Sequence, residues 1–98
     1  MDSAIVVYGV DTCEDTTRTR DHLDELGIGY TYVNLDVDAE AERRVREWNN
    51  GKRITPTVVL SSASGSKRMA EPENSELDAE LQRLHLLPPQ QRQPRRTA

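Results

Sequence analysis

The apolar residues of this 98-residue chain gather in short segments whose spacing alternates between that of strands and that of helices. Residues 5–8 are an apolar run rich in β-branched side chains, which is typical of a buried strand. Residues 13–26 are mostly polar but keep a weak apolar face at helical spacing. That face consists of Thr16, Thr19, Leu23 and Leu26. We therefore expect a strand and then a surface helix packed on one side, with Thr12 as its N-cap and Gly27 at its end.

The middle of the chain repeats this alternation. Residues 30–36 alternate polar and apolar side chains, which predicts a strand with Val33 and Leu35 facing inward. Residues 39–49 predict a second helix, because one apolar stripe follows helical spacing through them. The stripe consists of Ala41, Val45 and Trp48. Residues 57–60 form another β-branched run and predict a third strand.

The last part of the chain predicts a hairpin, a helix and a tail. Residues 61–66 are small and polar, as in a turn between strands, and residues 67–70 fit a short antiparallel fourth strand. Asn74 or Ser75 is expected to cap a final helix that Pro88-Pro89 stop. Its apolar stripe consists of Leu77, Leu81, Leu84 and Leu87. Residues 88–98 are rich in Gln, Pro and Arg, so we expect a disordered tail.

The expected order is β-α-β-α-β-β-α, with a parallel first pair of strands and a closing hairpin. It predicts an α/β protein with a four-stranded mixed sheet between helices on both faces, a three-layer α/β/α sandwich, in one domain over residues 1–87. Active groups of such sheets gather beyond the carboxyl ends of strands. The loop after Tyr8 lies at such an end, and it leads to Cys13.

Cys13 is the only cysteine of the chain and stands at the expected start of the first helix. A helix start offers free N–H groups and the positive end of the helix dipole, and both favour a thiolate. The three acids beside it, Asp11, Glu14 and Asp15, oppose ionisation unless Arg18 or Arg53 reaches the site. Cys13 is thus a candidate nucleophile, and the alternative is a small core residue.

Charge and composition exclude several classes of function. The net charge is −4, with +3 in residues 88–98 and −7 in the rest, which argues against nucleic acid as the main partner. A single cysteine excludes an internal disulfide or a thiolate metal cage. His22 and His85 are far apart in sequence, so no metal site is predicted and His22 is expected at the surface. No apolar run is long enough for a bilayer and no secretory signal is visible, so we expect a cytoplasmic monomer.

The chain resembles the glutaredoxins of the thioredoxin fold across residues 4–87. The blocks that carry the resemblance are residues 7–9, 23–30, 34–38 and 50–59, and residues 71–77 look closer to the mycoredoxins and related small redoxins. The family motif Cys-x-x-Cys is here Cys13-Glu14-Asp15-Thr16. The nucleophile position is kept, and threonine stands at the position of the resolving cysteine.

The resemblance implies a monothiol cycle of thiol–disulfide exchange. Cys13 would attack a mixed disulfide, and a low-molecular-weight thiol would regenerate it. Thr16 would either donate a hydrogen bond to the thiolate or simply fill the place of a cysteine. Pro56 corresponds to the cis-proline of the fold, next to a residue whose backbone binds the substrate; a trans proline that opens a strand is the alternative.

The resemblance also assigns thiol or substrate contacts to Thr12, Arg53, Thr55, Pro56, Glu73 and Asn74. Residues 71–74 replace the Gly-Gly turn and acidic pair with which glutathione-using members hold their ligand. The co-substrate is therefore expected to be glutathione or mycothiol, with no bound cofactor, and the partners are protein mixed disulfides.

The alternative function is a redox-inactive binding or regulatory module of the same fold. A phosphate-binding cysteine loop has the wrong spacing, and the motif of iron–sulfur relatives is missing.

Overall fold

The computed structural model describes residues 3–87 and contains four strands and three helices. The elements in chain order are β1 (Ala4–Gly9), α1 (Glu14–Glu25), β2 (Thr31–Asn34), α2 (Ala39–Trp48), β3 (Thr57–Ser62), β4 (Gly65–Ala70) and α3 (Asn74–Arg83). This is the predicted β-α-β-α-β-β-α order. The expected disorder of residues 88–98 lies outside the described residues, whereas the predicted stop at Pro88-Pro89 is wrong, because α3 already ends at Arg83.

The four strands form one mixed sheet in the order β2-β1-β3-β4. β1 and β2 are parallel, with Tyr8 opposite Val33, whereas β1 and β3 are antiparallel, with Val7 opposite Val58. The β3–β4 hairpin is tighter than the sequence suggested, because Ser62 pairs with Gly65 and leaves a two-residue turn. β2 and β4 are the edges, and the exposed residues of β4 leave its outer side open.

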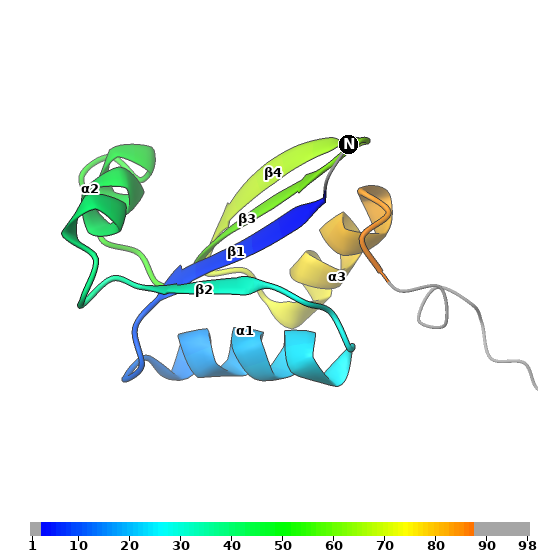
Figure 1. The fold of residues 1–98 in the computed structure, drawn as a ribbon, viewed down its shortest axis with the longest axis horizontal. Helices are drawn as coiled ribbons and strands as arrows, with labels where there is room; N and C mark the ends of the chain where they lie inside the picture. The colour runs from blue at the N-terminus through cyan, green and yellow to red at the C-terminus, as the bar shows by residue number, and fades with distance from the viewer. Residues whose placement is uncertain (1–2, 88–98) are drawn as a thin grey trace, which may run out of the picture.

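The helices cover the two faces of the sheet as separate layers (Figure 1). One core joins α1 and α3 to the sheet and is lined by Ile5, Val7, Leu23, Ile28, Val58, Leu60, Leu77, Leu81 and Leu84. A smaller core joins α2 to the opposite face and is lined by Tyr8, Val10, Leu35, Ala41 and Val45. The α/β/α sandwich and the predicted inward faces of all three helices are confirmed. None of the helices among residues 3–87 is long and apolar enough to cross a membrane.

The start of α1 differs from the prediction by one residue. Cys13, and not Thr12, is the N-cap: it is extended (φ −91°, ψ 121°), and its carbonyl accepts the Thr17 N–H at 3.1 Å. Thr12 is exposed and lies one residue outside the helix. The end agrees with the prediction, because Gly27 takes the left-handed conformation (φ 73°) that closes the last turn. Cys13 therefore lies at the junction of loop and helix.

The start and end of α3 also needed correction. Its N-cap is Glu73, not Asn74 or Ser75, because the Glu76 carboxylate accepts the Glu73 N–H at 2.9 Å. The helix ends before residue 88: His85 is left-handed (φ 60°), and the Leu86 N–H donates to the Leu81 carbonyl at 2.8 Å.

His22 is not the free surface residue that the sequence suggested. Its Nε2 lies 2.6 Å from Asp78 Oδ1, so the pair links α1 to α3. The side chain of His22 is only 16% exposed. Because Asp78 is 56 residues away in sequence, no spacing pattern could have revealed the contact.

α1 rests on β1 through the contact between Gly9 and Thr16. A Cβ atom placed on Gly9 would lie 2.5 Å from the Thr16 hydroxyl oxygen and 2.6 Å from its methyl carbon. Thr16 is fully buried, so it has little room to move aside. The missing side chain of Gly9 thus allows the helix that follows Cys13 to approach the strand.

We predict that Gly9→Ala destabilises the fold by about 1–3 kcal/mol, because the new methyl group overpacks this contact. Urea denaturation followed by circular dichroism measures the change. Gly29→Ala is the control, because a Cβ there meets nothing within 4 Å; its effect should stay within about 0.5 kcal/mol. Equal effects of the two substitutions would contradict the proposed role of Gly9.

Candidate active site

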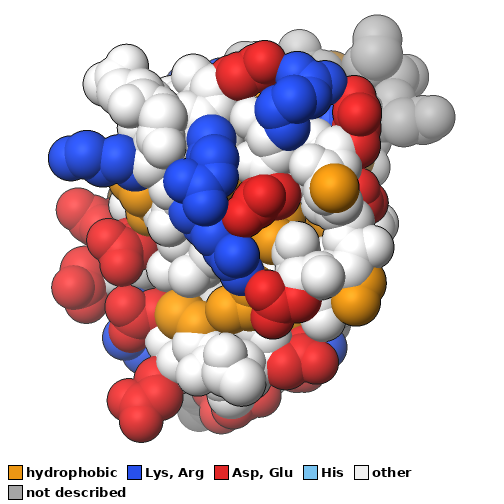
Figure 2. Space-filling view, turned by 90° about the vertical axis from the view of Figure 1, so that its left-hand side faces the viewer, with side chains coloured by type: hydrophobic (Ala, Val, Ile, Leu, Met, Phe, Trp, Pro, Cys, Tyr) orange, Lys and Arg blue, Asp and Glu red, His pale blue; other side chains and the backbone are white. Residues whose placement is uncertain are grey.

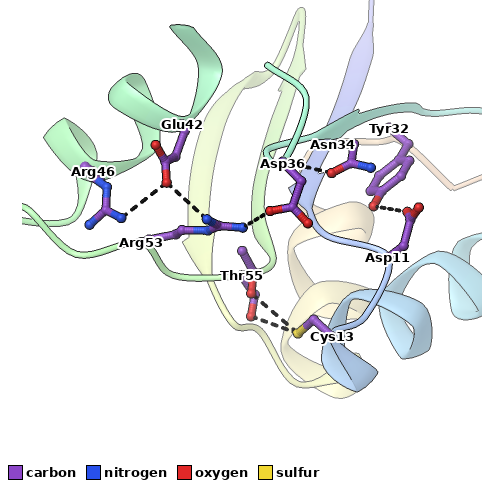
Figure 3. Close-up of polar contacts among 9 residues, drawn as sticks. All are labelled: Asp11, Cys13, Tyr32, Asn34, Asp36, Glu42, Arg46, Arg53 and Thr55. Carbon is purple, nitrogen blue, oxygen red and sulfur yellow. Dashed lines mark hydrogen bonds and ion pairs between the residues drawn. The ribbon is translucent and has the colours of Figure 1, made fainter. Parts of the chain in front are cut away.

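The sulfur of Cys13 lies against Thr55 from the opposite side of the site (Figure 3). The thiol donates to the Thr55 carbonyl oxygen at 3.6 Å, and the Thr55 hydroxyl donates to the sulfur at 3.4 Å. Cys13 is half-buried and not disulfide-bonded. The two residues are 42 positions apart in sequence, so the contact joins the start of α1 to the loop before β3.

The Thr55–Pro56 peptide bond is cis, as the resemblance implied. The loop around it is fixed by local hydrogen bonds. Thr57 Oγ1 donates to the Ile54 carbonyl at 2.8 Å and accepts from the Asn49 side-chain amide at 3.2 Å. On the other side the Glu71 N–H donates to the Pro56 carbonyl at 2.8 Å. The loop that carries Thr55, the partner of the Cys13 sulfur, is thus held by α2, β3 and the segment before α3.

Glu71 begins the segment that the sequence analysis compared with the Gly-Gly turn of glutathione-using members. It adopts φ 49°, the left-handed conformation that glycine accommodates most easily. The backbone at Glu71 therefore bends as a glycine would allow, and the residue carries an exposed carboxylate side chain at this bend.

Two effects act on the thiol. Partial burial raises the pKa of Cys13, but the hydrogen bond from the Thr55 hydroxyl, the nearby Thr16 hydroxyl and the Thr16 and Asp15 N–H groups outweigh burial and lower it below the ordinary cysteine value. The N–H groups belong to the first turn of α1. The helix start therefore favours the thiolate, as the sequence suggested.

Thr16 is fully buried one turn after Cys13. Its hydroxyl has no hydrogen-bond partner within bonding distance among the described residues, yet it lies near enough to the sulfur to lower the pKa of Cys13. A buried hydroxyl without a partner costs folding free energy. Thr19, one turn further along α1, is buried and unpartnered in the same way.

Two of the three acids beside Cys13 have partners that reduce their effect. Asp15 lies 2.8 Å from the Arg18 guanidinium, as the sequence allowed. Asp11 accepts a hydrogen bond from the Tyr32 hydroxyl at 2.7 Å. Burial and this bond raise the pKa of Tyr32 to about 12, so Tyr32 remains a neutral donor at physiological pH.

Arg53 lies beside Thr55 but is already engaged by carboxylates (Figure 3). Its guanidinium donates to Asp36 at 2.6 Å and to Glu42 at 3.1 Å. Glu42 also accepts from Arg46 at 3.2 Å. The sequence analysis missed Asp36 and Glu42 as site residues, since they stand 17 and 11 positions from Arg53 with no motif to link them.

The remaining predicted residues lie at the starts of α1 and α3. Thr12 is exposed next to Cys13, and Glu73 is exposed at the start of α3. Asn74 lines a surface groove of about 390 Å³ with Glu14 and Thr17 of α1. The structure thus brings Cys13, Thr16, Thr55 and Pro56 together, with Arg53 held to one side and Asn74 facing α1. Among residues 3–87 there is no group of three His, Cys, Asp or Glu side chains that could hold a metal ion.

A comparison with protein-family models matches residues 5–62 to the family described as Glutaredoxin. The chain belongs to the glutaredoxin family. The match spans the strand–helix start with Cys13 and the segment with Thr55 and Pro56, and it confirms the resemblance noted from the sequence. Thiol–disulfide oxidoreductase chemistry is the general role that this family supports. No curated protein matches the chain.

Solved structures share the thioredoxin-like fold of this glutaredoxin. The structure of a malarial protein is 16% identical with a TM-score of 0.64, and the match covers 86% of this chain and 98% of that one. Wheat glutaredoxin is 21% identical with a TM-score of 0.60, covering 85% and 76%. A maleylacetoacetate isomerase from Anaeromyxobacter dehalogenans, with dicarboxyethyl glutathione and citrate bound in its active site, is 18% identical with a TM-score of 0.55 and covers 90% and 41%.

We predict that Thr55→Val raises the pKa of the Cys13 thiol, because the substitution removes the hydroxyl that donates to the sulfur. The ultraviolet absorbance of the thiolate, followed across pH, measures the midpoint. The wild-type midpoint should lie below that of a free cysteine. Thr17→Val on the exposed side of α1 is the control and should leave it unchanged. An unchanged midpoint in Thr55→Val would show that the hydroxyl contributes nothing.

Proposed function

We propose that the protein catalyses thiol–disulfide exchange by a monothiol mechanism, with Cys13 as the nucleophile and a low-molecular-weight thiol as co-substrate. The observation that carries this proposal is the position of Cys13, at the start of α1 and against the residue before the cis-proline. Family membership supplies the reaction class. A dithiol mechanism within one chain is impossible, because Cys13 is the only cysteine.

The cycle has two exchanges that balance without an external oxidant. In the first, the Cys13 thiolate attacks one sulfur of a mixed disulfide; a new disulfide to Cys13 forms, and the protein thiolate leaves with the electron pair of the old bond. In the second, the thiolate of a free small thiol attacks that disulfide, releases Cys13 and leaves as a symmetric small disulfide. No resolving cysteine is needed in either step.

The groups around the sulfur have distinct parts in this cycle. The N–H groups of the first turn and the Thr16 and Thr55 hydroxyls stabilise Cys13 as a thiolate, both before attack and as the leaving group in the second exchange. In this proposal the backbone of Thr55, next to the cis-proline, aligns the substrate peptide beside the sulfur, as an added strand does. Thr12, Glu73 and Asn74 border the site and supply polar contacts to the small thiol.

Glutathione and mycothiol are the two proposed co-substrates. Glutathione is supported by the family, and a neighbour in fold carries a glutathione derivative in its active site. Mycothiol is supported by the resemblance of residues 71–77 to mycoredoxins. Both thiols are compatible with a cytoplasmic monomer, which we propose as the working state.

A redox-inactive binding or regulatory module is the second candidate function. The acids around Cys13 and the missing resolving cysteine favour it. The same site would then hold a peptide or thiol without turnover. The two functions differ in one measurable quantity, the rate of disulfide exchange at Cys13.

We predict that the wild-type protein reduces the mixed disulfide of hydroxyethyl disulfide with glutathione or with mycothiol, and that Cys13→Ser abolishes the reaction. Consumption of NADPH through the matching small-disulfide reductase measures the rate, and Thr17→Ser is the control. A lack of turnover with both thiols would support the redox-inactive module. Full activity in Cys13→Ser would exclude any role of the thiol.

We further predict that Thr16→Val lowers the exchange rate at neutral pH on the order of tenfold, since loss of the Thr16 hydroxyl raises the pKa of Cys13 and so lowers the fraction of thiolate. The same substitution should stabilise the fold, because it removes a buried hydroxyl that has no partner. Thr19→Val is the matched control: it removes an equally buried, unpartnered hydroxyl one turn away and should stabilise the fold without changing the rate. If Thr16→Val kept full activity, threonine there would only fill space.

A further inference from the structure

We propose that the site selects disulfides that are neutral or cationic near the sulfur and disfavours those that carry carboxylates there, because Asp36 and Glu42 occupy Arg53. This inference rests on the proposed exchange at Cys13 and specifies its substrate class: of the two proposed co-substrates it favours mycothiol, because glutathione carries two carboxylates. Two features support it: the pairing of the cation beside Thr55 and the charge balance of the segments that meet at the sulfur, to which that pairing contributes.

Arg53 is the guanidinium nearest the substrate-binding backbone of Thr55 in sequence, two residues away. One of its terminal nitrogens donates to Asp36 and the other to Glu42, at 2.6 and 3.1 Å. The hydrogen bond to Asp36, the largest effect, raises the pKa of Arg53. A carboxylate on the substrate would have to displace one of these two acids before it could bind the guanidinium of Arg53 through two hydrogen bonds.

The other charges at the site leave an excess of acid. The carboxylates on the segments that meet there, and on the partners of Arg53, are Asp11, Glu14, Asp15, Asp36, Glu42, Glu71 and Glu73. The cations are Arg18, Arg46, Lys52 and Arg53, which leaves a balance of −3. Arg18 and Arg46 are paired with Asp15 and Glu42. Lys52 is exposed and is the one of these four cations without a carboxylate partner among the described residues.

Figure 2 shows the face of the molecule that carries α2 and the start of α1, on which a stripe of basic side chains runs down the middle with acidic side chains on both sides of it. A substrate that approaches Cys13 therefore meets a net negative field in which Arg18, Arg46 and Arg53 are already paired with carboxylates. Such a field raises the local concentration of cationic substrates and slows anionic ones. The selection acts in the first exchange, in which the thiolate attacks the disulfide and the leaving sulfur takes the electron pair.

Three small symmetric disulfides test the selection: cystamine (cationic), hydroxyethyl disulfide (neutral) and dithiodipropionate (anionic). The rate at which each forms a mixed disulfide with Cys13 is followed by mass spectrometry under pseudo-first-order conditions. Each rate is divided by that of a neutral model thiol, N-acetylcysteine amide, to remove the intrinsic reactivity of the disulfide. We expect cystamine to react on the order of tenfold faster than dithiodipropionate at low salt, with a difference that shrinks as salt is added.

Variants of the two acids test the part played by Arg53. Asp36→Asn should release the guanidinium and raise the rate with dithiodipropionate relative to cystamine by about threefold, the effect of one unit charge across several ångströms of water. Glu42→Gln should change the ratio in the same direction and covers the case in which Asp36→Asn fails to fold. The matched control is Asp24→Asn, which removes the same charge from an exposed position near the far end of α1 and should leave the ratio unchanged.

The outcomes separate this inference from the proposed function. If Cys13 exchanges with none of the three disulfides, the proposed function fails. If it exchanges with all three at equal normalised rates, or fastest with dithiodipropionate, the function stands and the charge selection is wrong. If the charge order holds but Asp36→Asn and Glu42→Gln both act like Asp24→Asn, the occupation of Arg53 is not its cause and the inference as stated is overturned.

Discussion

The contact between the Cys13 sulfur and Thr55 depends on most of the structure. The sulfur is carried by the junction of β1 and α1, and its partner is carried by the loop between α2 and β3. Neither residue can reach the other until β1 and β3 have paired and α1 has settled on the sheet. Gly9 permits that approach of the helix, and the bonds of Thr57 fix the loop. The contact between Cys13 and Thr55 therefore forms only when the sheet and the helices are correctly assembled. The site is thus positioned by these secondary-structure elements and not by a flexible loop.

The sequence predicted the elements well because their signals are local. Alternation in residues 30–36 and the stripe through Val45 depend only on which side chains face the core, and the motif at Cys13 and Pro56 is a short pattern. The caps were predicted less well, since Thr12 and Asn74 have the right chemistry but the backbone makes Cys13 and Glu73 the N-caps. Caps depend on where the chain turns into the helix, and tertiary packing sets that point.

Long-range polar partners were beyond the reach of the sequence for a different reason. The contact of His22 with Asp78, and those of Arg53 with Asp36 and Glu42, each join residues from separate elements. Charged residues are frequent on the surface of this chain, so every arginine has several possible partners and no spacing rule selects one. Only the register of the sheet and the placement of the helices decide among them. Site chemistry that depends on a motif is therefore readable from sequence, whereas site electrostatics require the three-dimensional structure.

The open outer side of β4 has a consequence for how copies of the protein meet in concentrated solution. An unpaired edge strand is a template for another strand, and two copies of β4 could in principle align antiparallel about a twofold axis. About a twofold axis the central residue of the new pair faces its own copy, so the registers centred on the middle of Gly65–Ala70 place Lys67 opposite Lys67 or Arg68 opposite Arg68. Like charges placed directly opposite each other destabilise strand pairing. The positive charges on β4 therefore oppose extension of the sheet from one molecule into the next.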